Sequence, residues 1–171
     1  MTKSADPTRD SFRKLESVLA AQLEEYRTMR GLIERRRDAL RHADAAALRK
    51  ALDAEHAAIV RIGELDRARG EVAGALARRL GIGGNVTMSA LAARAHPDVR
   101  ESLEVVAAAL RDEVDACRRA SSVVRAAADA LAQHVSGVMQ TVQQAFASAH
   151  TYGRAGRLAG AVPIRSIDLR S

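Results

Sequence analysis

The sequence predicts an all-α protein, an elongated antiparallel helical hairpin plus a long third helix that form a three-helix, coiled-coil-like bundle. Aromatic residues, which strands favour, make up only 2% of the 171 residues, while Ala, Leu, Val and Arg dominate. Pro, the strongest helix breaker, occurs 3 times. Apolar residues recur at helical spacing over three long stretches. Together these observations favour long helices packed side by side.

The first helix is expected over roughly 8–42, starting at Asp6 and Pro7 because Pro is tolerated in the first helical turn. Its apolar positions follow at intervals of three, four or seven residues, which is a heptad seam: Phe12, Leu15, Leu19, Tyr26, Met29, Ile33 and Leu40. Gln22 and Arg36 occupy the two seam positions that apolar residues skip.

A short break at His42, Ala43 and Asp44 separates the first helix from the second, with Asp44 as the expected N-cap. Gly81 is the expected C′ glycine of the second helix, and Ile82 is placed for the apolar contact that accompanies it. A break this short predicts an antiparallel hairpin. The apolar stripe of the second helix is Leu48, Leu52, Ile59, Ile62, Leu65, Val72, Leu76 and Leu80.

Glu55 and Arg69 interrupt this stripe, 14 residues apart and too distant to pair within one helix. We expect both to bond across to other helices, with Arg36 as a partner for Glu55. Residues 81–97 form a loop in which Thr87 or Ser89 caps a short helix over 90–95.

The third helix is expected from Pro97 to about Gly153, with Gly137 as its one weak point. Its apolar residues fall on one arc: Val99, Leu103, Val106, Leu110, Val114, Cys117, Val124, Leu131, Val135, Val138, Val142 and Phe146. Cys117, the single cysteine, is therefore expected to be a buried small hydrophobe. Residues 1–152 are predicted to form one helical domain, and 153–171 a flexible basic tail containing Gly.

The net charge of +6 is concentrated at the two ends of the chain and does not form a basic stripe, which argues against a nucleic-acid binder. Arg35, Arg36 and Arg37 form the one basic run, and on a helix they point in different directions. The polar first ten residues lack the core of a signal peptide, and no apolar stretch is long enough for a membrane span. We expect a cytoplasmic protein.

No motif indicates catalysis, a metal site or a cofactor. The five histidines are scattered, and the glycines at 81–84 lack the strand and the Lys of a phosphate loop. We therefore expect no enzyme activity.

The third helix has an unusual C-terminal segment. At about 1.5 Å per residue it is longer than either hairpin helix by roughly 25 Å, so its C-terminal end is expected to extend past the hairpin. Residues 130–153 contain no Asp, Glu, Lys or Arg. The pattern is compatible with intrachain core, with a homodimer seam, or with a binding surface for a partner helix. The apolar stripe here is Leu131, Val135, Val138, Met139, Val142 and Phe146.

The ordered combination of segments is similar to the FlgN family of flagellar export chaperones over nearly the whole chain. The segments are Leu23-Glu24-Glu25-Tyr26 and Leu32-Ile33-Glu34-Arg35, then Leu65-Asp66-Arg67-Ala68-Arg69 and Leu80-Gly81, then Met88-Ser89-Ala90-Leu91-Ala92, and finally Tyr152-Gly153-Arg154-Ala155-Gly156.

The resemblance implies a chaperone that binds the C-terminal helical segments of flagellar hook–filament junction proteins, prevents their premature assembly and delivers them to the flagellar type III export gate. It places client binding on the six stripe residues from Leu131 to Phe146, and export-gate docking at Tyr152. The resemblance implies no cofactor. The alternative is a homodimeric coiled-coil scaffold, which would dimerise with no need of a client, and a homodimer in the absence of client is compatible with both functions.

Overall fold

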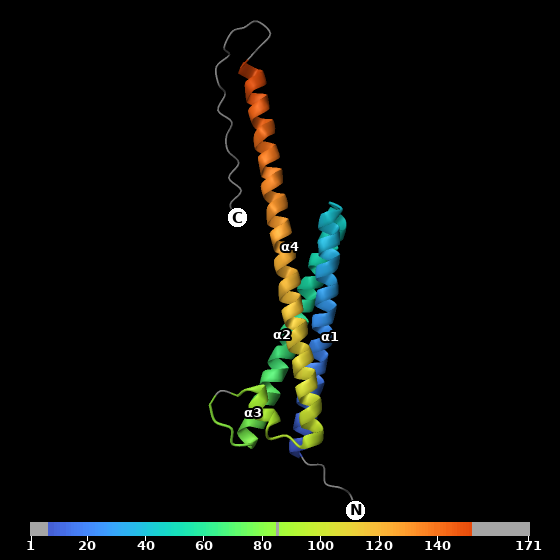
Figure 1. Cartoon of the computed structure of the whole chain (residues 1–171), viewed down its shortest axis with the longest axis vertical. Coiled ribbons are helices and arrows are strands. Elements are labelled where there is room, and N and C mark those ends of the chain that lie inside the picture. The colour runs from blue at the N-terminus through green and yellow to red at the C-terminus, as the bar shows by residue number, and fades with distance from the viewer. Residues whose placement is uncertain (1–6, 85, 152–171) are drawn as a thin grey trace, which may run out of the picture. The chain divides into compact units, whose positions relative to one another are not determined.

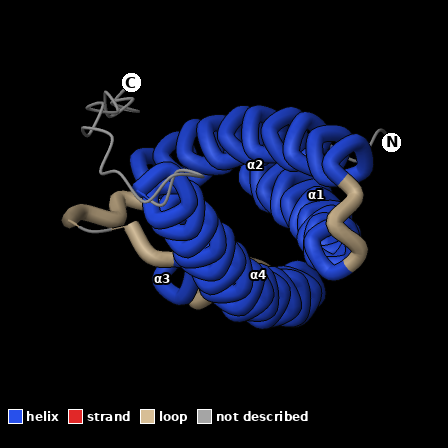
Figure 2. Tube along the Cα trace, turned by 90° about the horizontal axis from the view of Figure 1, so that it is seen from above, coloured by secondary structure: helices blue, strands red, loops and turns tan. Residues whose placement is uncertain are grey.

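A computed structural model describes residues 7–84 and 86–151, with side chains through residue 147. The elements are α1 (Pro7–Arg41), α2 (Ala45–Arg79), α3 (Met88–Ala92) and α4 (Pro97–Thr151). Short loops connect these helices, and the described residues contain no strand (Figure 2). The predicted all-α class is therefore confirmed, and α4 continues through Gly137 without a break.

The connection between α1 and α2 is held by backbone hydrogen bonds and by the predicted cap. The N–H of Asp44 donates to the carbonyl of Ala39 at 2.9 Å, and the N–H of Ala43 donates to Leu40 at 3.2 Å, which closes α1. The Asp44 carboxylate then accepts from the N–H of Ala47 at 2.9 Å and starts α2. One aspartate thus ends one helix and caps the next, and α1 and α2 run antiparallel (Figure 1).

Ala43 occupies the left-handed region in this turn, at φ 51°. This conformation brings Cβ close to the carbonyl oxygen and costs a non-glycine residue about 1–2 kcal/mol. We expect Ala43→Gly to raise the free energy of unfolding by about 0.5–1 kcal/mol, since glycine's greater unfolded-state entropy offsets part of the relief. Chemical denaturation checks this. The control Ala20→Gly, at an exposed position within α1, should lower the free energy by up to about 1 kcal/mol. A loss of stability in both variants would contradict the expectation.

The end of α2 has the predicted glycine motif. Gly81 has a φ of +65°, its N–H donates to Arg78 at 3.3 Å, and the N–H of Ile82 donates to Ala77 at 2.9 Å. The side chain of Ile82 packs against buried residues. The short helix α3 starts two residues earlier than predicted, because Thr87 is its cap and accepts from the N–H of Ala90 at 3.2 Å. The prediction of a helix over 90–95 is therefore wrong in its bounds.

The chain divides into two units, residues 1–125 and 126–171. The first unit contains the hairpin, α3 and the first part of α4, and its core has two clusters of buried apolar residues. One cluster is Phe12, Leu15, Leu19, Leu76, Ala77, Leu91, Ala95, Val99 and Leu103. The other is Met29, Leu32, Ile33, Ala58, Cys117 and Val124. Burial of Cys117 and of five predicted seam residues of α1 is thus confirmed, whereas Tyr26 and Leu40 are only partly buried. Burial also raises the pKa of the Cys117 thiol.

The predicted stripe of α2 is wrong in the half near the hairpin turn. Leu52 and Ile59 are 46% and 58% exposed, whereas Ala51, Glu55 and Ala58 are buried. Small side chains at the contact allow two helices to approach closely, so alanines there displace the larger residues to solvent.

Two polar predictions for α2 had different outcomes. Arg36 Nη1 donates to Glu55 Oε2 at 2.8 Å, which confirms the expected pair between α1 and α2. Arg69 instead pairs with Asp66 on its own helix, so its expected bond to another helix is wrong.

Burial raises the pKa of Glu55 above its ordinary value of 4.5, although the charge of Arg36 opposes this effect. The folded chain therefore binds this proton more tightly than the unfolded chain does. The stabilisation that this proton gives the folded chain is fully present at pH values below the pKa of Glu55 in the unfolded chain. It is lost as pH rises through the pKa of Glu55 in the folded chain. Relative to Glu55→Gln, the wild type should gain stability as pH falls from about 7 towards the pKa of Glu55 in the unfolded chain. Thermal unfolding of both proteins across this range tests the sign, and a wild-type advantage that shrinks as pH falls would contradict it.

Candidate functional site

The six predicted stripe residues all lie on α4 in the second unit, and all are exposed. We call them the 131–146 stripe. Their exposed fractions are 45% for Leu131, 52% for Val135, 49% for Val138, 54% for Met139, 42% for Val142 and 67% for Phe146. Every residue from Asp129 to Ala147 is exposed. A run of large apolar side chains left in water along several helical turns is the usual mark of a surface that binds a partner.

The same arc of α4 is core in the first unit. Leu103 is fully buried, and Cys117 and Val124 are 6% and 3% exposed. The 131–146 stripe continues this arc at spacings of three, four and seven residues from Val124. The described chain covers the arc up to Val124 and leaves the remainder exposed. Intrachain core, one of the three alternatives left open by the sequence, is therefore not what the described residues form.

The flanks of the stripe are polar but uncharged. Amides and hydroxyls, such as those of Gln133, Ser136 and Gln140, take the positions that charged residues usually occupy on a solvated helix. Thr141 Oγ1 donates to the carbonyl of Gly137 at 3.0 Å, so this hydroxyl is satisfied within the helix. The surface offers apolar area and neutral hydrogen-bonding groups, which suits helix-on-helix packing with little electrostatic contribution.

The other predicted functional residue, Tyr152, lies outside the described residues. No group of three or more His, Cys, Asp or Glu side chains within the described part of the chain is placed to hold a metal ion. None of the helices described is both long and apolar enough to cross a membrane.

Together, these observations define an all-helical protein with an exposed, uncharged apolar helix face, the kind of surface on which helical proteins bind partners. The family model described as FlgN protein matches residues 1–160. The chain therefore belongs to the FlgN family, a family of flagellar export chaperones and not of enzymes. No curated protein and no solved structure gives a match to the chain.

The sequence pattern did not predict one feature of the first unit, a groove between α1 and α2 near their connection. It forms where both helices contribute alanines, including Ala39, Ala47, Ala51 and Ala54. The clustering of alanines at helical spacing on the first turns of α2 is the signal that could have indicated it. The prediction followed the larger apolar residues Leu52 and Ile59 instead of these alanines.

Proposed function

We propose that this protein binds the amphipathic C-terminal helical segments of flagellar hook–filament junction proteins along the 131–146 stripe. It keeps these clients unassembled in the cytoplasm and delivers them to the flagellar type III export gate. The observation that carries the proposal is the exposure of six large apolar side chains on α4, within a stretch of the sequence, 130–153, that contains no Asp, Glu, Lys or Arg. Family membership supports a chaperone role in flagellar export.

The proposed mechanism is the shielding of a surface. A client segment with an apolar face would associate with other copies or aggregate, and a chaperone helix packed on that face removes the exposed area. Met139 supplies a flexible, polarisable side chain that adapts to more than one shape, and Phe146 supplies the largest apolar area of the stripe. The complex must later dissociate at the gate. A Kd between micromolar and submicromolar, about 8–10 kcal/mol of binding free energy, would satisfy both requirements.

Calorimetric titration with a synthetic peptide from the C-terminus of a junction protein of the same organism tests the proposal. We expect saturable binding at a ratio of one to one. Because the segment bears no formal charge, the Kd should change little between low and high salt. A peptide of the same composition in scrambled order is the control. Absence of binding, or equal binding of the scrambled peptide, would contradict the proposal.

We further propose that Tyr152 contributes to docking at the export gate and not to client binding. Tyr152→Ala should then leave the Kd for the client peptide unchanged and reduce export of the junction protein from cells. A matched Tyr152→Phe variant separates the hydroxyl from the ring. Loss of client binding in Tyr152→Ala would remove the docking role.

A homodimer that forms in the absence of client is the second candidate. Val135 and Val142 are separated by one heptad, and the uncharged flanks produce no repulsion between two copies. Sedimentation at several protein concentrations distinguishes the two proposals. A stable dimer that client peptide does not dissociate favours the homodimeric scaffold, whereas a monomer, or a dimer that the peptide dissociates, favours the chaperone.

A further inference from the structure

The 131–146 stripe repeats, further along α4, the face of this helix that is buried in the first unit. Residues 18 apart on an α-helix are separated by about five full turns, so their side chains point in the same direction. A step of 18 residues back from each stripe residue between Leu131 and Val142 leads to positions that are all buried or half-buried. These positions are Glu113, Cys117, Ala120, Ser121 and Val124. The stripe therefore continues an interface that the first unit already forms.

In the first unit two antiparallel helices share the burial of this face. Cys117 and Val124 belong to one cluster with three residues of α1 and with Ala58 of α2, which is fully buried. On the α1 side of the face, Arg30 Nε lies 2.6 Å from Glu113 Oε1. This face of α4 is thus one that a pair of helices covers.

The stripe is as wide as a face that packs against two helices. Val138 and Met139 are consecutive residues, so their side chains point about 100° apart, and they are 49% and 54% exposed. Val142 points between them. An apolar face about 100° wide is typical of a helix packed in a bundle, whereas the seam between only two helices is narrower. A single partner helix centred on Val142 would leave the outer sides of Val138 and Met139 in water.

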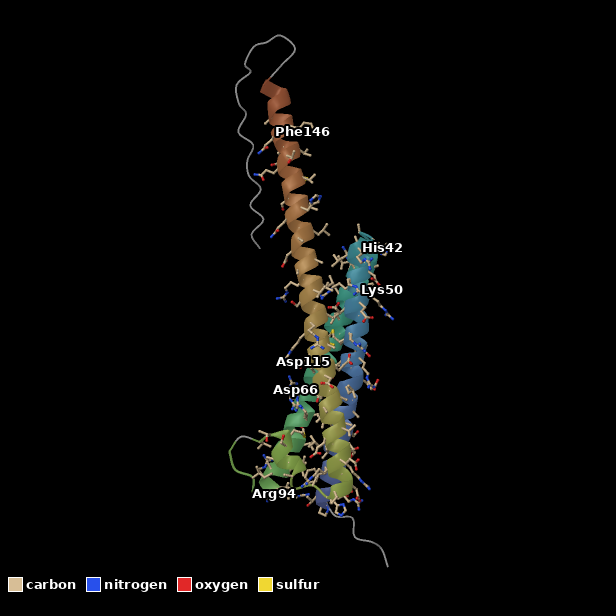
Figure 3. All side chains as sticks on the ribbon, in the orientation of Figure 1. His42, Lys50, Asp66, Arg94, Asp115 and Phe146 are labelled. Atoms are coloured by element: carbon tan, nitrogen blue, oxygen red, sulfur yellow. The ribbon has the colours of Figure 1, made fainter. Side chains whose placement is uncertain are left out.

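We propose that the client binds the 131–146 stripe as a helical hairpin, with one client helix on the Val138 edge and an antiparallel client helix on the Met139 edge. The inference rests on the proposed function and specifies the form of the client. Figure 3 shows Phe146 near the C-terminal end of α4, and the distance along the helix from Leu131 to Phe146 is about 23 Å. Each client helix therefore needs about 15 residues, and the hairpin roughly 35 with its turn.

Calorimetry of the full chain with two synthetic peptides, the last 20 and the last 40 residues of the junction protein, tests the hairpin. We expect the longer peptide to bind one to one and at least about tenfold more tightly, because its second helix binds as a tethered segment. With Ser in place of Leu, Ile and Val in its first half, it should bind no more tightly than the shorter peptide. Equal affinity of the two unsubstituted peptides would overturn the hairpin and leave the proposed function standing. Absence of binding by both would overturn the proposed function itself.

Hydrogen–deuterium exchange of the bound 40-residue peptide distinguishes a hairpin from one long helix, which could also gain affinity because longer helices form more readily. We expect two protected segments separated by a short turn that exchanges fast. A single uninterrupted protected segment would overturn the proposal.

Variants at the two edges complete the test. Val138→Ala and Met139→Ala should each weaken binding of the 40-residue peptide by about fivefold or more, because each removes apolar area from the contact with one client helix. Alanine favours the helix, so α4 is retained in both variants. Gln140→Ala, on the opposite face, is the control and should leave the Kd unchanged. Weakening at one edge alone would show that one helix covers the stripe and would overturn the hairpin.

Discussion

Val142→Asp should abolish binding of the client peptide and leave the folded core intact. In the free protein Val142 is 42% exposed, so the new carboxylate stays in water and costs little. Valine and aspartate also have similar helix propensities. In the complex the carboxylate would be buried against an apolar face with no partner, a penalty of about 3 kcal/mol or more, roughly a hundredfold in Kd. Calorimetry measures the loss, and circular dichroism checks that helicity and thermal unfolding stay close to wild type. Val138→Asp should behave in the same way.

The matched control places the same charge on the opposite face of the same segment. Gln140 lies two residues before Val142 and points away from the stripe, since each residue turns the helix by about 100°. Gln140→Asp should therefore retain client binding. Equal loss of binding in both variants would show that any charge in this segment is disruptive, and unfolding of Val142→Asp would show that the residue belongs to the core.

Leu15→Ala should produce the largest loss of stability. Leu15 is fully buried in the first cluster, among Phe12, Leu19 and Leu76, which leaves little room for the core to relax around the deleted methyl groups. Substitutions of this kind cost about 2–5 kcal/mol, a large part of the total stability of a domain this size. Chemical denaturation followed by circular dichroism gives the value.

The control for Leu15→Ala is the same substitution on the exposed stripe. Leu131 is 45% exposed, so Leu131→Ala should change the free energy of unfolding by less than about 1 kcal/mol. It should instead weaken client binding. If Leu131→Ala destabilised the protein as much as Leu15→Ala, the 131–146 stripe would be core.

Local signals predicted the three long helices and their ends well, but not the bounds of α3. Asp44 and Gly81 act at the positions where cap chemistry placed them, and between Phe12 and Ile33 the predicted seam of α1 is buried except at Tyr26, which is half-buried. These features depend on hydrogen bonds and spacing within a few residues of sequence. The heptad pattern to which Leu15 and Leu19 belong also leaves only one face of α1 suited to burial.

Which face of α2 meets α1 could not be predicted from size alone. Leu52 and Ile59 are larger than Ala51 and Ala58, so near the hairpin turn the strongest apolar pattern pointed to side chains that prove to be exposed. Close packing of two helices selects small residues, and this preference depends on a neighbour that the local sequence does not specify. The groove between α1 and α2 could not be predicted from the sequence for the same reason.

The 131–146 stripe illustrates a different limit. Val124 and Val135 belong to one apolar arc, yet Val124 is 3% exposed and Val135 is 52% exposed. Periodicity is identical on both sides of that boundary, so it could not separate core from surface. The absence of charged residues over 130–153 was the one sequence feature that distinguished this segment. The exposure of its apolar residues now supports the interpretation as a binding surface.

Hydrogen–deuterium exchange along α4, with and without the junction-protein peptide, tests client binding on the stripe most directly. Exposed helix with no packing partner exchanges readily, and a bound helix protects it. We predict that the peptide slows exchange within residues 129–147 and leaves exchange around Leu15 and Leu103 unchanged. Peptide binding with no added protection in 129–147, or with protection confined to the first unit, would contradict a client site on the 131–146 stripe.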